Sequence, residues 1–459
     1  MLDFQTIAAI IFVVILTLVL FLNRKKLETT FLVPYLIYFS MYKTKLGLNL
    51  MDSLSKKFRR TTIYLGYFGI FIGFLGMIAI SYGLISNIFA FFTKPGAATG
   101  VGLVLPIKGK GIFYVPFFYW IISIFVIAVV HEFSHGWIAR AHNIKVKSSG
   151  FAFLGGGFRL VGLVSIIISL FIKTKNNLIF DFNSNFLDYS KPEFWIIIGI
   201  ILLASSYIKK ISELNGIPII PAAFVEPDEK ALRKRPHSQQ LSVFAAGPLA
   251  NIITGFIFLL LAIFMLTPII TAAIEPNGVK VTDFVKGNAT YPAESSGIKI
   301  GETIQQIGST QTPYVENLSQ ILRSKKPGDV VTLTTDKSFY QVKLAKNPEN
   351  ESSAYIGAYL EQSTKIKESV QSKYGEFLPN AGLWFYGLFI TLFILNLGIG
   401  LFNLVPLGPL DGGRMLQLPL QKYFGEENGK KIWVYIGLIF LAIIIINVGA
   451  GFGLFNFLK

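Results

Sequence analysis

The residues best suited to chemistry are His131 and His135, which begin and end the segment His-Glu-Phe-Ser-His. On a helix, residues four apart lie on one face with Cβ atoms about 6 Å apart, so both imidazoles can reach one metal ion. Glu132 lies beside the first histidine, where its carboxylate can move a proton between a zinc-activated water and a leaving amine. Since the chain has only 4 histidines, this spacing predicts a catalytic site for one zinc ion. A structural hydrogen-bonding cluster and metal binding without catalysis are the alternatives.

A catalytic zinc site needs a third protein ligand and an open fourth position. The chain has no cysteine, and His142 and His237 are its only other histidines, so a carboxylate is the most economical third ligand. Asp411 is the best candidate, because it follows a long apolar run in a segment broken by proline and glycine. Asn403, in the same segment, offers an amide that can hold a substrate backbone or an oxyanion. The alternative roles are a helix cap for Asp411 and packing for Asn403.

The composition indicates a membrane protein. Hydrophobic residues make up 52% of the 459 residues and charged residues only 15%, whereas soluble proteins have about 25% charged residues. The net charge of +16 comes from lysines and arginines beside apolar segments, where they orient the chain and contact anionic lipid. We therefore expect the lipid bilayer, and no nucleic acid, as a partner.

The apolar segments predict a polytopic α-helical membrane protein with about 6–8 membrane segments. Residues 6–22, followed rather than preceded by positive charge, are expected to be a retained first helix. Residues 31–50 are expected to form an interfacial helix. Two short apolar stretches within 159–215, joined by a polar link, are compatible with a helical hairpin, two interfacial helices or a re-entrant pair. Further spans are expected at about 62–92, which we expect to be broken or tilted, and at 116–140, 242–270, 380–402 and 432–449.

The positive charges also predict an orientation. Lys56, Lys57, Arg59 and Arg60 form a cluster before one of the expected spans, and the positive-inside rule places this loop in the cytoplasm. Counting spans from there predicts that the His helix and Asp411 both lie toward the cytoplasmic side of the cell membrane. Residues 275–375 are then expected outside.

Residues 277–345 differ from the rest of the chain, because short alternating segments replace the long apolar runs. Strands are expected at 279–285, 330–334 and 340–344, around one amphipathic helix at about 315–324. Loops between such strands would leave backbone groups unsatisfied in lipid. This segment is therefore expected to be an extracytoplasmic α/β domain inserted between two spans.

Together these motifs resemble the site-2 protease family of intramembrane metalloproteases. The resemblance covers the His131–His135 segment and the stretch Asn-Leu-Val-Pro-Leu-Gly-Pro-Leu-Asp-Gly that begins at Asn403. It implies zinc ligands at His131, His135 and Asp411, a catalytic glutamate at Glu132 and a membrane-embedded asparagine at Asn403. It also implies that the Gly-rich stretch at 150–157 is a β-hairpin that presents the substrate to the site as an added strand. Supporting matches are the segment 246–251 and, for an archaeal or eukaryotic type, the segment 217–229. One departure from the family pattern is 159–215, which is expected to be an insertion between the Gly-rich stretch and the segment 217–229.

The inserted domain resembles a PDZ domain, since Gly297 and Gly301 lie in a segment like the turn and strand typical of PDZ domains in proteases. We therefore expect a domain that docks peptides or filters substrates by size; a spacer without specificity is the alternative. The expected division is N-terminal helices and a basic loop at 1–110, a first protease half at 111–272, a PDZ-like domain at 275–365 and a second protease half at 380–459.

The function expected from these features is zinc-dependent intramembrane endoproteolysis of transmembrane proteins, that is, regulated intramembrane proteolysis. The alternatives are an inactive membrane scaffold that binds proteins through the PDZ-like domain, a CAAX-prenyl-type membrane zincin and a transporter. The CAAX-prenyl class would require a glutamate as third ligand, and a transporter would require internal repeats with paired broken helices. The sequence leaves the oligomeric state and the physiological substrate open.

Overall fold

The computed structural model describes residues 4–33, 37–93, 102–106, 111–171, 192–207, 216–285, 291–347 and 353–452. The chain divides into two compact units. The first is formed by residues 1–259 and 388–459 and contains the predicted metal-binding residues; the second is formed by residues 260–387.

The chain is a multi-pass membrane protein by the length and composition of its helices. Within the described residues, five helices are long and apolar enough to cross a bilayer, and each coincides with a predicted span. The span expected to be broken or tilted, α3, is one unbroken helix of 35 residues. At 1.5 Å per residue it is about 50 Å long, so it exceeds the roughly 30 Å hydrocarbon core. The five are α3 (Arg59–Thr93), α4 (Phe117–Ala141), the continuous helix His237–Ala273, α14 (Phe377–Phe402) and α16 (Glu426–Phe452).

The continuous helix consists of three parts, α9 (His237–Leu261), the π-helical turn η2 (Ala262–Leu266) and α10 (Thr267–Ala273). The predicted first helix is present as α1 (Phe4–Leu22).

The expectation of an interfacial helix at 31–50 is wrong. Most of this segment forms an antiparallel hairpin of two strands, and a helix begins only near its end. Strand-favouring Thr, Tyr and Phe residues occur throughout the hairpin, and its second strand pairs with a strand more than 100 residues further along the chain. That distant strand supplies hydrogen-bond partners for the backbone of β2. A local apolar pattern cannot predict such long-range pairing. The elements are η1 (Arg24–Lys26), β1 (Leu27–Val33), β2 (Ile37–Thr44) and α2 (Leu48–Lys57).

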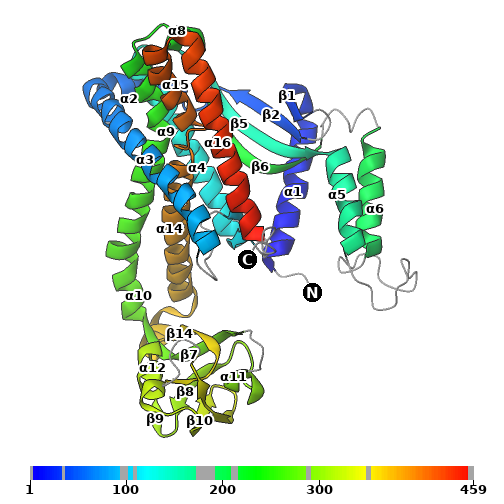
Figure 1. Cartoon of the computed structure of the whole chain (residues 1–459), viewed down its shortest axis with the longest axis vertical. Helices are drawn as coiled ribbons and strands as arrows, with labels where there is room; N and C mark the ends of the chain where they lie inside the picture. Colours follow the sequence, from blue (N-terminus) through cyan, green and yellow to red (C-terminus); the bar gives the residue numbers. More distant parts are fainter. Residues whose placement is uncertain are drawn as a thin grey trace. The chain divides into compact units, whose positions relative to one another are not determined.

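A four-stranded antiparallel sheet lies beside the helices of the first unit (Figure 1). Its order is β1-β2-β5-β6, where β5 is Val146–Gly157 and β6 is Gly216–Pro227. The expectation of a Gly-rich β-hairpin is wrong, because residues 150–157 belong to the single strand β5. This strand is paired on both sides, by β2 and by β6, which are distant in sequence. Within the described residues no further strand pairs with β6, so β6 is an edge strand of this sheet.

Between β5 and β6 the chain forms two apolar helices, α5 (Phe158–Phe171) and α6 (Pro192–Ser205), that lie side by side (Figure 1). A Cβ added at Gly162 would lie 2.9 Å from the Gly199 carbonyl oxygen. The two backbones can approach this closely because both residues lack a side chain. Of the three alternatives left open for 159–215, the paired helices fit a helical hairpin or a re-entrant pair. The polar link expected near residues 176–183 lies outside the described residues.

The irregular segment predicted after the span at 380–402 is present. The helix α14 ends at Phe402, and α15 (Asp411–Phe424) begins only after a series of turns. Added Cβ atoms at Gly412 and Gly413 would collide with the carbonyl oxygens of Leu404 and Leu407. Glycine is therefore required for the start of α15 to lie against these turns. The remaining elements of this unit are β3 (Leu103–Leu105), β4 (Ile112–Tyr114) and α8 (Glu229–Arg233).

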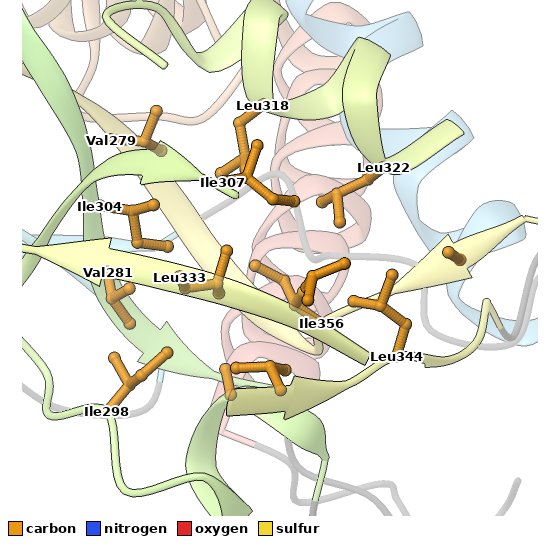
Figure 2. Packing of buried hydrophobic residues seen from close by; sticks show 14 residues of the cluster. Val279, Val281, Ile298, Ile304, Ile307, Leu318, Leu322, Leu333, Leu344 and Ile356 are labelled. Atoms are coloured by element: carbon orange, nitrogen blue, oxygen red, sulfur yellow. The ribbon is translucent and has the colours of Figure 1, made fainter. Parts of the chain in front are cut away.

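The second unit contains the predicted α/β domain. Strands are present at all three predicted positions, and the helix expected at about 315–324 is α12 (Val315–Ser324). Apolar residues of the sheet and of α12 pack into one core, including Val279, Leu318 and Leu333 (Figure 2). The sheet order is β11-β10-β8-β7-β14, with β9 beside β8. The elements are β7 (Ile274–Phe284), α11 (Pro292–Ser295), β8 (Thr303–Ile307), β9 (Thr310–Gln311), α12, β10 (Val330–Thr335), β11 (Phe339–Lys343), β12 (Ala345–Lys346), β13 (Ala354–Tyr355), β14 (Ala358–Ile366) and α13 (Glu368–Tyr374).

Candidate metal centre

The helix α4 positions both histidines. It begins after Pro116, runs through an almost wholly apolar segment and ends where Asn143 adopts a positive φ of 58°. The rings of His131 and His135 lie on one face with centroids 4.8 Å apart. The expected helical spacing therefore brings both imidazoles to one point.

The first turn of α15 brings the predicted third ligand to the same point. The Asp411 Oδ2 atom lies 3.0 Å from His131 Nε2 and 3.4 Å from His135 Nε2. Ligands held at zinc's usual distances in a tetrahedral site are about 3.4 Å apart, so these separations fit one zinc ion. Asp411 makes no side-chain cap for its helix, contrary to the alternative considered for it.

The hydrogen bond of His135 also fits a metal ligand. Its Nδ1 lies 2.6 Å from the Val243 carbonyl oxygen. A carbonyl only accepts hydrogen bonds, so Nδ1 carries the proton and Nε2 keeps its lone pair for a metal ion.

His131 has a comparable partner in Asn251, a residue whose role the sequence did not predict. The Asn251 side-chain amide lies 3.1 Å from His131 Nδ1, and Asn251 is fully buried in α9. The amide nitrogen faces the ring, and the amide oxygen has no hydrogen-bond partner within the described part of the chain. Because amide orientation is an assignment, the flipped form places the oxygen where it accepts from Nδ1–H and frees Nε2 for zinc.

The backbone of α9 also comes close to the site at Gly247. A Cβ added there would lie 2.5 Å from His135 Nε2 and 2.6 Å from His131 Nε2. Even alanine would therefore intrude on the metal-binding nitrogens. Gly247 and Asn251 both lie in the segment 246–251 that supported the family resemblance, and that segment was the only sequence signal for them.

Glu132 is connected to the edge of the sheet. Its Oε2 atom accepts a hydrogen bond of 3.2 Å from the Val225 N–H of β6. This N–H points toward α4 rather than toward β5. The carboxylate predicted to handle protons is therefore tethered to the edge strand.

All five predicted site residues line one pocket of about 770 Å³. His131, Glu132, His135 and Asp411 line it together with Asn403, whose backbone oxygen accepts a hydrogen bond from the Gly412 N–H. Part of the remaining wall comes from β6, and charged side chains also line the pocket. These charged residues are Lys147, Glu226, Glu229, Lys230 and Arg414. A pocket of this size with charged and polar groups in its wall can admit water.

The model for Peptidase family M50 matches residues 187–444, which is more than half of the chain. The chain belongs to this family. The matched region includes Asn251, Asn403 and Asp411 and begins after the helix with both histidines. The predicted class, a metallopeptidase of the site-2 protease family, is thereby confirmed.

Proteins that are similar in sequence support the same family assignment. Zinc metalloprotease RasP of Shouchella clausii is 24% identical over 51% of this chain and 66% of its own length. Zinc metalloprotease MJ0392 of Methanocaldococcus jannaschii is 48% identical over 11% of this chain and 15% of its own length. The M50 chain thus spans less than two thirds of either relative. The predicted zinc cofactor agrees with both names and with the His131, His135 and Asp411 cluster.

The solved structures that match include the PDZ domain of the SdrC-like protein from Listeria monocytogenes. It is 24% identical, with a TM-score of 0.16, and covers 18% of this chain and 87% of that domain. The archaeal type and the peptide-docking role of the second unit stay predictions.

Proposed function

We propose that this M50 protein is a zinc-dependent intramembrane endopeptidase that hydrolyses peptide bonds in or near transmembrane segments of other membrane proteins. One observation carries the proposal. The Nε2 atoms of His131 and His135 converge on the Asp411 carboxylate. These residues line a pocket that Glu132 also lines. Both histidines belong to α4, a helix that is apolar enough to cross a bilayer.

Zinc held by His131, His135 and Asp411 would supply a Lewis acid that polarises the scissile carbonyl and makes a water acidic enough to attack near neutral pH. Glu132 takes the proton of the attacking water on its carboxylate and delivers it to the leaving amine. Its hydrogen bond from the Val225 N–H holds the carboxylate in place for both transfers.

Asn403 is the proposed contact for the substrate backbone or the developing oxyanion. Asn403 lines the pocket directly after the end of α14, in a segment of turns rather than in a regular helix. Irregular backbone at membrane depth is tolerated where it lines a wet cavity. The charged side chains in the same wall support a supply of water, the second substrate of hydrolysis.

The edge of β6 is the proposed docking site for an extended substrate. This differs from the expectation for the Gly-rich stretch, because β5 is enclosed by β2 and β6. Pro221 and Pro227 of β6 are residues typical of edge strands. A helical substrate hides its peptide bonds, so it must unwind before it can pair with β6. Helix-breaking residues near the scissile bond should therefore increase cleavage.

The proposed location is the cell membrane, with the zinc site toward the cytoplasmic side and the PDZ-like domain outside. The cluster of positive charges at the end of α2 and the start of α3 supports this orientation. In this arrangement the PDZ-like domain would dock peptides or filter substrates before they reach the pocket.

The decisive experiment uses the purified full chain reconstituted with a model transmembrane substrate. Zinc content and cleavage are measured for wild type, Glu132→Gln and Asp411→Ala. We expect Glu132→Gln to retain zinc and lose cleavage by a factor of about 100 or more. Asp411→Ala should lose both, because two histidines alone make an incomplete site. Chelation of wild type should abolish cleavage, and added zinc should restore it.

Two results would contradict these assignments. Normal zinc content in Asp411→Ala would mean that another residue is the third ligand. A wild-type protein that binds no zinc and cuts nothing, yet retains membrane peptides, would instead support the scaffold function considered from the sequence.

A further inference from the structure

A second cavity, of about 280 Å³, lies away from the zinc-binding residues. It is formed where α2 ends, α3 begins and α4 ends. Its wall contains four cationic side chains and a single carboxylate. The cations are Lys56, Arg59, Arg140 and Lys145, and the carboxylate is Asp52.

The one carboxylate is already paired. Arg140 Nε lies 3.1 Å from Asp52 Oδ1. Among the described residues, no ion pair involves Lys56, Arg59 or Lys145. Within the part of the chain that the structure describes, the cavity therefore concentrates three positive charges that form no ion pair with a carboxylate.

Stabilisation of the end of α4 does not account for these charges. Cations are favourable near the carboxyl end of a helix, and Arg59 Nε donates to the Ala141 carbonyl oxygen there. That bond uses one of five guanidinium donors. Lys56 and Lys145 donate to no helix carbonyl among the hydrogen bonds of the described residues. Membrane orientation needs positive charge in this loop, but it does not need that charge to surround a cavity.

We propose that this cavity binds a phosphate group, carried by an anionic lipid headgroup or by free phosphate. The guanidinium of Arg59 and the two ammonium groups offer the charge-assisted donors that phosphate oxygens accept. Arg59 is the first residue of a candidate span, and basic residues beside spans attract anionic lipid headgroups, so a headgroup is one candidate source of the phosphate. The site uses none of the residues assigned to zinc or substrate and goes beyond the proposed protease function.

The test measures binding of phosphatidylglycerol, titrated into the detergent-solubilised full chain and counted by native mass spectrometry. The variant Lys56→Gln/Arg59→Gln removes two cavity cations. We expect the affinity to fall about fivefold for each cation removed, and so about 25-fold for both. Lys56→Gln alone keeps the Arg59 bond to α4 and should show the fivefold loss without any risk to folding.

The matched control is Lys57→Gln/Arg60→Gln, which removes the same charge from neighbouring residues that do not line the cavity. It should leave lipid affinity within about twofold of wild type. A parallel titration with inorganic phosphate at constant ionic strength distinguishes the two sources. Saturable phosphate binding that Lys56→Gln/Arg59→Gln weakens would identify a soluble ligand, and binding of the lipid alone would identify a headgroup. Equal losses in both double variants, or no loss in either, would overturn the proposal.

Discussion

Replacing Asn251 should weaken zinc binding even though Asn251 does not touch the metal. Its amide is the only hydrogen-bond partner recorded for His131 Nδ1 among the described residues. Zinc binding at Nε2 requires that the proton of the neutral ring be on Nδ1. The Asn251 oxygen must therefore accept a hydrogen bond from Nδ1–H. In Asn251→Ala, a buried N–H donor loses its acceptor, and the ring loses the contact that fixes its orientation.

The expected loss is 10- to 100-fold in zinc affinity, as is usual when the outer partner of a metal ligand is removed. This corresponds to about 1.4–2.8 kcal/mol, within the range for a hydrogen bond to a charged group. Competition with a zinc chelator would measure it on the purified full chain. Asn251→Asp should stay close to wild type, since a carboxylate also accepts from Nδ1–H.

Asn396→Ala is the matched control. Asn396 is also a fully buried asparagine in a candidate span, but its side chain donates to the Leu392 carbonyl oxygen of its own helix. We expect its zinc affinity to stay within about threefold of wild type. Normal zinc binding by Asn251→Ala would refute the reasoning. An equal loss of affinity in Asn396→Ala would also refute it, because the effect would then be one of general packing.

Three further predictions concern other parts of the first unit. Gly247→Ala should lose most of its zinc after gel filtration, because the new methyl would lie within 2.6 Å of both ligand nitrogens; full retention would contradict this geometry. Val225→Pro removes the N–H that Glu132 accepts without removing a bond to β5, so cleavage should fall about 10- to 100-fold with zinc content unchanged; equal loss of zinc would point to a disrupted fold. The Ala231 N–H donates to Asp228 and holds the pKa of that carboxyl below its usual value, so this stabilisation exists above about pH 4 and is lost as the pH falls through the lowered pKa. Asp228→Ala should therefore melt earlier than wild type at pH 7, and the difference should close in acid; a constant difference would exclude the carboxylate as its source.

The sequence predicted the helical spans well because each is encoded locally. A run of about 20 apolar residues must be helical in lipid, whatever surrounds it. The helix α12 was also predictable, since its amphipathic period is contained in ten residues. In the metal centre, His131 and His135 are linked by helical spacing alone. Asp411 required an additional chemical argument, namely that no cysteine and few histidines were available.

Features that depend on distant pairing were not predictable in the same way. The hairpin β1–β2 was mistaken for a helix because its partner β5 lies more than 100 residues away. The sequence also drew attention to the Gly-rich strand, whereas the edge beside Glu132 belongs to β6. Asn251 and Gly247 had no chemical signal of their own, because an amide and a glycine acquire their roles only once α9 lies against α4.

The insertion between β5 and β6 need not disturb the metal centre. The two strands remain paired from Val146–Pro227 to Gly157–Gly216, although the α5–α6 hairpin separates them in the chain. That hairpin closes on itself through the contact of Gly162 with Gly199, so its packing does not depend on the far end of the ladder. Val225, near the opposite end of β6 from the insertion, keeps its bond to Glu132. If a substrate docks on the β6 edge as proposed, the insertion is placed to change how the substrate approaches that edge without changing the groups that would cleave it.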